Sequence, residues 1–375
     1  MILMKNRIKI NMIMILACLV MCISCVILPV CAEEKTITVV DDLNREVTIQ
    51  VPPSAVVSTG MATRFLSYLD ALDPVIAVSS NDASNPVSLS GAAYKLANPQ
   101  LQNLPVVCEI ASVNLNEELI TSMNPDLIYK SDISDAKEAD ELSAKTRAPV
   151  VTIIKGGLGT EQDRNDLYRN LRLLGEITGK SEKAEDLIAY IETTIKDLND
   201  RTKNIDDSAK PSVYVGGLAY KGSHGIESTS GTEPALGFIN VNNVATGMPS
   251  SGSVSKEQIL AWDPDIIFID LATLGNAKTG KTAIQQLESD PSLKNLKALK
   301  NGQIYTTLPN VWSYSNMETP LANAYYMGSV VYPDAFDDID PKEKADEIYT
   351  KFLGSPLFAE LNAQYENLAY LNLDF

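Results

Sequence analysis

A short sequence pattern occurs twice in this chain, at residues 118–128 and at residues 257–267. Each copy begins with a glutamate, continues with apolar residues at the spacing of a helix, and ends in Pro-Asp followed by a hydrophobic run. Proline ends a helix and aspartate turns the chain, so each copy predicts a short helix followed by a strand. One copy would be ordinary punctuation between helix and strand, whereas two copies in the two halves of the chain indicate two lobes of similar design.

Residues 181–203, which lie between the two copies, are predicted to form one long helix. Gly179 can end the preceding helix, and Ser181 is a suitable N-cap residue. At about 1.5 Å per residue the helix would be roughly 35 Å long, about the width of a small domain. It is either a rigid connector that fixes the separation of two lobes or an ordinary surface helix of one larger domain. Its apolar residues recur at helical spacing: Ala184, Leu187, Ile188, Ile191, Ile195 and Leu198.

Strand-like and helix-like runs alternate on both sides of this helix. In the first half, residues 55–58 form a short apolar strand, a helix follows, and residues 74–78 form the next strand. In the second half, residues 211–215 and 265–270 are predicted strands. This order implies parallel pairing, so we predict an α/β fold for each half.

Residues 1–32 are predicted to be a signal peptide or an N-terminal anchor and not part of the fold. Basic residues precede residue 10, an apolar run covers residues 10–30, and residues 30–32 resemble a small-x-small cleavage site. Three outcomes remain open at this point: cleavage, lipidation at Cys25, or a retained membrane anchor. In each case the chain is extracytoplasmic, either secreted or periplasmic, or tethered to the outer face of the cell membrane.

Composition excludes some partners and some kinds of metal site. The formal net charge is −17, which argues against binding to nucleic acid or to an anionic membrane surface. Four of the five cysteines precede residue 32, so only Cys108 remains if the leader is removed. The chain then has no internal disulfide and no cysteine-based metal site.

The ordered set of segments resembles the substrate-binding proteins of ABC importers for iron–siderophore complexes and cobalamin, the class III periplasmic binding proteins with a helical backbone. The resemblance covers nearly the whole chain after the leader, and it implies two Rossmann-like α/β lobes joined by a single long α-helix. It also implies little hinge motion and a ligand cleft between the lobes. The segments that carry it, besides the two Glu…Pro-Asp copies, are residues 36–52, 56–58, 174–180 and 332–336. The implied parts are an N-terminal lobe at residues 33–178, a linking helix at residues 179–205 and a C-terminal lobe at residues 206–375.

In that family one glutamate on each lobe pairs with arginines of the membrane permease. The positions that match are Glu118 and Glu257, although Glu117 is adjacent and the first assignment could shift by one residue. Carboxylates on both lobes would give two contact points with a basic surface. The alternative is that both glutamates only cap the starts of their helices.

Lobe two carries five candidate ligand contacts. His224, the only histidine, follows Tyr220 and Lys221 in a glycine-flanked polar loop that would face the cleft. It could cap a metal chelate or hydrogen-bond a carboxylate, and it could equally be a structural or exposed histidine. Trp312 and Tyr314 follow a strand, where aromatic rings suit stacking on a planar or apolar chelate.

Lobe one carries three further candidates. Met61 and Arg64 follow a strand-to-helix turn, and Tyr94 lies in the polar loop at residues 79–102. Arg64 could pair with an anionic chelate, or it could be a solvated residue of a helix. Because ligand residues vary within the family, the resemblance does not decide among these positions.

We predict a binding protein that captures a metal chelate (a ferric siderophore-like complex) or a corrinoid and delivers it to an ABC permease and its ATPase. We expect no enzymatic activity, and no cofactor or metal site of its own. Capture of a bare metal such as zinc is disfavoured because one histidine and one cysteine remain. A metallocofactor-handling enzyme on the same fold is the main alternative, but the chain has no GxSxG motif, no phosphate loop and no evident nucleophile–base pair. A tethered ligand sensor is the third possibility.

Overall fold

The structure is a computed structural model that describes residues 35–84, 91–109, 114–219, 221–278, 280–312 and 314–375. Residues Thr36–Phe375 form one compact unit. The predicted leader, residues 1–32, and the ligand candidate Tyr220 lie outside the described residues, and the side chain of Trp312 is not described. Within the described part of the chain, no helix has both the length and the apolar character needed to cross a membrane.

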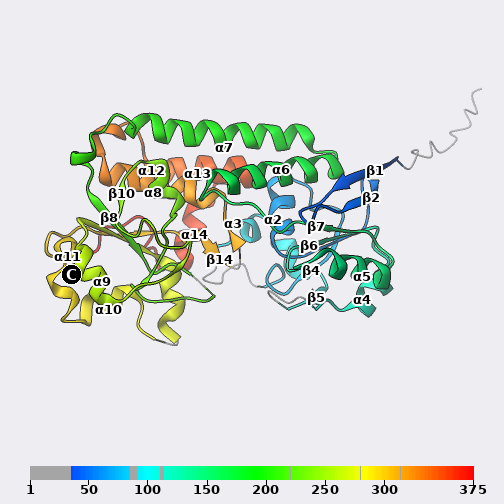
Figure 1. Ribbon diagram of the computed structural model, residues 1–375, viewed down its shortest axis with the longest axis horizontal. Coiled ribbons are helices and arrows are strands. Elements are labelled where there is room, and N and C mark those ends of the chain that lie inside the picture. Colours follow the sequence, from blue (N-terminus) through cyan, green and yellow to red (C-terminus); the bar gives the residue numbers. More distant parts are fainter. Residues whose placement is uncertain (1–34, 85–90, 110–113, 220, 279, 313) are drawn as a thin grey trace, which may run out of the picture. The chain divides into compact units, whose positions relative to one another are not determined.

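Lobe one contains a five-stranded parallel sheet in the order β5-β4-β3-β6-β7 (Figure 1). Every residue of β3, β6 and β7 is buried, as expected of parallel strands that are covered by helices on both faces. The strands of this half are β1 (Lys35–Val40) and β2 (Glu46–Val51), which form a separate hairpin, and β3 (Val56–Ser58), β4 (Val75–Ser79), β5 (Val106–Cys108), β6 (Leu127–Lys130) and β7 (Val150–Thr152). The helices are α2 (Met61–Tyr68), α3 (Ala93–Ala97), α4 (Glu117–Met123), α5 (Ala136–Thr146) and α6 (Glu161–Thr178).

Lobe two contains a four-stranded parallel sheet in the order β10-β8-β12-β13. Two short antiparallel pairs, β9 with β11 and β14 with β15, lie outside this sheet. The strands are β8 (Ser212–Gly216), β9 (Ser228–Thr229), β10 (Asn242–Asn243), β11 (Gly252–Ser253), β12 (Ile266–Asp270), β13 (Ile304–Thr307), β14 (Val311–Trp312) and β15 (Tyr314–Ser315). The helices are α8 (Pro234–Phe238), α9 (Lys256–Trp262), α10 (Ala283–Ser289), α11 (Lys297–Lys300), α12 (Glu318–Val331), α13 (Pro341–Leu353) and α14 (Phe358–Gln364).

Helix α7 (Ser181–Thr202) joins the two lobes and packs against α6, α8 and α12 (Figure 1). Five of its six predicted apolar positions are buried, and Ile195 is partly buried. Gly179 ends α6 with a φ of 72°, as predicted. The prediction that Ser181 is the N-cap is wrong by one residue, because Ser181 is the first helical residue and the N-cap position is Lys180. The structure therefore confirms that this helix connects two lobes, and it confirms the two-lobe α/β fold.

The repeated Pro-Asp pattern makes the same connection in both lobes. In lobe one the carboxylate of Asp126 accepts hydrogen bonds from the backbone N and the hydroxyl of Ser54, at 2.7 and 2.8 Å. In lobe two the carboxylate of Asp265 accepts from the backbone N and the hydroxyl of Ser212, at 2.8 and 2.7 Å. In each lobe this link ties the first strand of the sheet to the strand after the repeated helix, and the two strands pair in parallel. The repeat therefore reflects a structural equivalence between β3–β6 and β8–β12.

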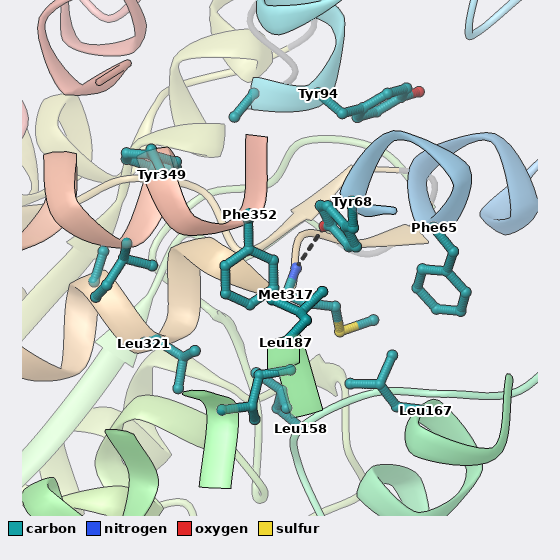
Figure 2. Close-up of a cluster of buried hydrophobic side chains, with 14 of the residues drawn as sticks. Phe65, Tyr68, Tyr94, Leu158, Leu167, Leu187, Met317, Leu321, Tyr349 and Phe352 are labelled. Carbon is teal, nitrogen blue, oxygen red and sulfur yellow. Dashed lines mark hydrogen bonds between the residues drawn. The ribbon is translucent and has the colours of Figure 1, made fainter. Parts of the chain in front are cut away.

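The largest hydrophobic core runs from lobe one across α7 to the C-terminal helices (Figure 2). Tyr68 of α2 meets Phe352 of α13 edge to face, with ring centroids 5.1 Å apart, and its hydroxyl accepts a hydrogen bond from the backbone N of Met317 at 3.1 Å. Two smaller cores belong to one sheet each. Helix α13 packs on α2 and α3, so the largest core extends across the predicted boundaries at residues 178/179 and 205/206. The exact lobe boundaries stay a prediction.

Candidate ligand-binding cleft

A cavity of about 800 Å³ is lined by loops from both lobes. Three of the loops follow the carboxyl ends of the parallel strands β7, β8 and β13, which is where open α/β sheets bind ligands. Its volume lies within the range of roughly 300–1,000 Å³ that is typical of small-molecule sites. Lobe one contributes Gly156, Gly157, Leu158, Gly159 and Asp163. Beyond α7, the lining consists of Leu218, Ala219, Lys221, Gly222, Ser230, Thr232, Glu233, Pro234, Ser250, Ser251, Asn310, Val311, Ser315, Met317 and Pro320.

A second depression, of about 400 Å³, lies on lobe one alone. It is lined by Pro53 and Pro74, which precede strands β3 and β4, and by Lys180 at the end of α6. Because it sits at the amino ends of the strands, it has neither the position nor the two-lobed lining of a binding cleft.

The lobe-one wall of the cavity is the glycine-rich loop between β7 and α6. Thr160 caps α6, since its hydroxyl accepts from the backbone N of Asp163 at 3.1 Å and its own backbone N donates to the Asp163 carboxylate at 3.0 Å. A Cβ added at Gly159 would lie 3.3 Å from the carbonyl oxygen of Thr232 in lobe two. A glycine at this position therefore lets the two walls approach one another closely.

The lobe-two wall contains a buried carboxylate, Glu233, which immediately precedes α8. The residue is only 5% exposed, and its carboxylate accepts a hydrogen bond from the Asn310 amide at 2.5 Å. The Asn310 carbonyl in turn accepts from the Asn323 amide at 2.9 Å, and the Asn323 carbonyl accepts from the Tyr370 hydroxyl at 3.1 Å. This chain of buried hydrogen bonds holds the carboxylate of Glu233, which is a residue of the cavity lining, in one orientation.

Burial raises the pKa of Glu233 to about 7, although the Ala235 backbone and the Asn310 side chain oppose that change. Burial also raises the pKa of Asp270 on β12 well above its ordinary value, and the nearby Glu233 carboxylate adds to the increase. The Glu233 carboxyl can therefore gain or lose its proton near neutral pH.

Residues 51–311 match the family model described as periplasmic binding protein. The chain belongs to the periplasmic binding protein family. The uncharacterised ABC transporter substrate-binding lipoprotein YvrC of Bacillus subtilis is 21% identical over 312 residues, which are 82% of this chain and 90% of YvrC. The Fe(3+)-citrate-binding protein YfmC of the same bacterium is 25% identical over 294 residues, 75% of this chain and 82% of YfmC. The solved structure of the molybdate-binding protein MolA of Haemophilus influenzae, bound to molybdate, has a TM-score of 0.65 at 20% identity and covers 85% of this chain and 98% of MolA.

This periplasmic binding protein is thus an ABC transporter substrate-binding protein, and its family is non-enzymatic. The family match confirms the resemblance inferred from the ordered segments, and with it the expectation that the protein is not an enzyme. Membership also implies a small-molecule ligand and an ABC transporter as partner, and it favours an extracytoplasmic location.

The ligand candidates of lobe one lie in a buried polar cluster. Arg64 is 1% exposed, so the alternative that it is a solvated helix residue is wrong. Its guanidinium donates to the carbonyl oxygen of Ser315 at 2.9 Å and lies 4.8 Å from the ring centre of Tyr94. The Tyr94 hydroxyl donates to Asp82 at 2.7 Å, and the backbone N of Met61 donates to the Ser131 hydroxyl at 2.9 Å. Met61, Arg64 and Tyr94 therefore do not line the cavity, and their contact with ligand stays a prediction.

The candidates of lobe two are divided between the cavity and its surroundings. Lys221 lines the cavity and is exposed. His224 is half-buried outside the lining, and its carbonyl oxygen accepts from the Thr273 hydroxyl at 2.7 Å. Tyr314 donates its hydroxyl to the carboxylate of Asp132 in lobe one, and burial raises its pKa. The hairpin of β14 and β15 therefore contacts both lobes.

The docking candidates Glu118 and Glu257 occupy equivalent positions. Each is the second residue of its helix, α4 or α9, and each is exposed. The helix starts are capped by other residues, since the Asn116 and Ser255 side chains accept the capping hydrogen bonds. Glu117 is the first residue of α4 and pairs with Lys145 at 3.0 Å. The equivalence with Glu257 therefore favours Glu118 over Glu117.

Sequence reasoning missed Glu233, Asn310 and the glycine loop as parts of the cleft. The run at residues 230–234 shows only small and polar residues that end in Glu-Pro, which is typical of many loops. The burial of Glu233 depends on Asn310 and Asn323, which lie 77 and more residues further along the chain. Among the described residues, no group of three or more His, Cys, Asp or Glu side chains is arranged to hold a metal ion.

Proposed function

We propose that this protein captures a metal chelate outside the cytoplasm, either a ferric siderophore-like complex or a corrinoid, and delivers it to an ABC permease and its ATPase. The observation that carries the proposal is the cavity of about 800 Å³ between loops of both lobes. A single metal ion is held by a few ligand atoms at about 2.0–2.6 Å, which needs far less room. A cavity of this size suits an organic complex whose surface is largely buried on binding.

The comparisons support a metal-containing ligand. YfmC is named for Fe(3+)-citrate and MolA was solved with molybdate, so both relatives are described with small metal complexes or metal oxyanions. The described part of the chain lacks a cluster of metal-ligating side chains, which favours recognition of the metal's organic shell over direct coordination of the ion.

Delivery is proposed to use Glu118 and Glu257 as two docking points on the permease. Both carboxylates are exposed at the second position of a short helix, and neither is needed to cap it. Two carboxylates on separate lobes can fix the orientation of the protein on a basic partner surface and increase the association rate.

The direct test is isothermal titration calorimetry of the purified chain against ferric hydroxamate, ferric catecholate, ferric citrate, haem and corrinoid complexes, together with native mass spectrometry. We expect saturable binding of at least one chelate and a mass increase that matches it. Binding of none of these chelates, together with tight binding of a metal-free solute, would overturn the proposal.

A further inference from the structure

The ionisable side chains of the described cavity lining are Asp163, Lys221 and Glu233. The Asp163 carboxylate accepts two hydrogen bonds from Thr160, so it is committed to the start of α6. Lys221 is exposed. Glu233 is therefore the charged group that a ligand in the cavity would meet away from bulk water.

Neighbouring groups hold the Glu233 carboxylate in place as a hydrogen-bond acceptor before a ligand binds. Oε1 accepts from Asn310, which is itself oriented by Asn323 and Tyr370, and the backbone of Ala235 also bonds to this carboxylate. The remaining polar side chains of the lining are an amide and hydroxyls, which carry no charge, and no arginine is among the described residues of the lining. An anionic ligand would therefore meet a buried carboxylate, with the exposed Lys221 as the one cation among the described lining residues.

We propose that Glu233 selects the charge of the ligand: the cavity takes neutral or cationic chelates that offer an N–H or O–H group to this carboxylate, and it rejects anionic complexes. This inference rests on the proposed function, since it specifies the class of chelate that is captured. A donor on the ligand forms a charge-assisted hydrogen bond with the carboxylate. An anionic ligand instead places like charges together in a poorly solvated site, which is an effective way to exclude a competing ligand.

The test measures affinity at pH 8 for ligands that differ mainly in charge. Ferrioxamine B is a ferric trihydroxamate with one ammonium group, and its N-succinyl derivative replaces that ammonium with a carboxylate. A cationic cobinamide, molybdate and a ferric tricatecholate complete the panel. We expect the tightest ligand to be a neutral or cationic member, and the succinylated complex to bind at least tenfold more weakly than its parent.

The variant Glu233→Gln keeps the shape of the side chain and its contact with Asn310. Loss of a charge-assisted hydrogen bond should weaken the preferred ligand roughly tenfold to a hundredfold and reduce the discrimination against anions. Glu227→Gln is the matched control, because Glu227 is half-buried in the same lobe, bonds to Gln286 at 3.0 Å and does not line the cavity. We expect its affinities to match those of the wild type.

The possible outcomes separate this inference from the proposed function. If the wild-type protein binds an anionic chelate most tightly, or if Glu233→Gln leaves the charge preference unchanged, the charge-selection inference is wrong and chelate capture stands. If no chelate of any charge binds, both proposals are wrong. Because the comparison of ferrioxamine B with its succinyl derivative uses the wild-type protein, it decides the question even if the variant does not fold.

Discussion

The buried carboxyl of Glu233 predicts that Glu233→Gln stabilises the ligand-free protein, and that the gain grows with pH. Burial raises the pKa of this group from 4.5 to about 7 in the folded state. Above pH 7 the Glu233 carboxyl is ionised in the folded and in the unfolded chain. The free energy of the folded chain is then raised by the full cost of an ionised buried group. A change from 4.5 to about 7 corresponds to about 3 kcal/mol. Glutamine has the same shape and carries no such cost.

The sign of the effect follows from proton linkage. Below pH 4.5 the carboxyl is protonated in the folded and the unfolded chain, and its pKa costs no stability. As pH rises toward 7 the unfolded chain releases its proton first, so the wild type loses stability relative to the variant. The loss amounts to about 1 kcal/mol at pH 5 and about 3 kcal/mol at pH 8.

The assay is urea denaturation of the wild type, Glu233→Gln and the control Glu227→Gln, each without ligand, at pH 5 and pH 8. We expect the stability difference between Glu233→Gln and the wild type to increase by about 2 kcal/mol between the two pH values. The control shows the effect of replacing a glutamate of the same lobe that does not line the cavity. A Glu233→Gln difference that is constant with pH, or that decreases toward pH 8, would refute the assignment of a buried, proton-releasing carboxyl.

Three further predictions concern docking and the contacts between the lobes. The double variant Glu118→Arg with Glu257→Arg should abolish uptake by cells and leave ligand affinity in calorimetry unchanged, since both residues are exposed and neither lines the cavity; normal uptake would remove the docking assignment. Tyr68→Phe removes the hydroxyl that donates to the buried Glu318 carboxylate at 2.5 Å, so the free energy of unfolding should fall by about 1–3 kcal/mol; an unchanged denaturation midpoint would contradict this. Gly60→Ala should destabilise the fold by more than about 1 kcal/mol, because Gly60 has a φ of 68° and a Cβ there would lie 2.6 Å from the Ser131 side chain; thermal unfolding at the wild-type temperature would show that the backbone tolerates the change.

The parts of the fold that could be predicted from sequence are those set by neighbours in the chain. The period of apolar residues identified α7, and the repeated Pro-Asp pattern identified equivalent strands in two lobes, because these signals lie within single segments of 11 to 22 residues. The N-cap of α7 was misplaced by one residue, since Lys180 takes that position without a side-chain hydrogen bond. Local signals therefore gave the elements and their order, while a helix boundary remained uncertain by a residue.

The cleft was harder to predict because its character depends on distant segments. Arg64 looked like an available cation at the start of α2, but it is covered by the hairpin that contains Ser315, 251 residues further along the chain. Glu233 looked like an ordinary loop residue, but it is buried and bonds to Asn310, which lies 77 residues further along the chain. A single sequence contains the residue types but not these pairings.

The contacts that bury Arg64 also limit how the two lobes can move. Hydrogen bonds from Arg64 to Ser315, from Tyr68 to Glu318 and from Tyr314 to Asp132 join segments at least 182 residues apart. They connect lobe one to the β14–β15 hairpin and the start of α12, so the two halves are tied together by these contacts as well as by α7. Large hinge opening would break these three hydrogen bonds, and a hydrogen bond to a charged group contributes about 1.5–3 kcal/mol. These three pairs favour the little hinge motion that the family resemblance implies, which stays a prediction.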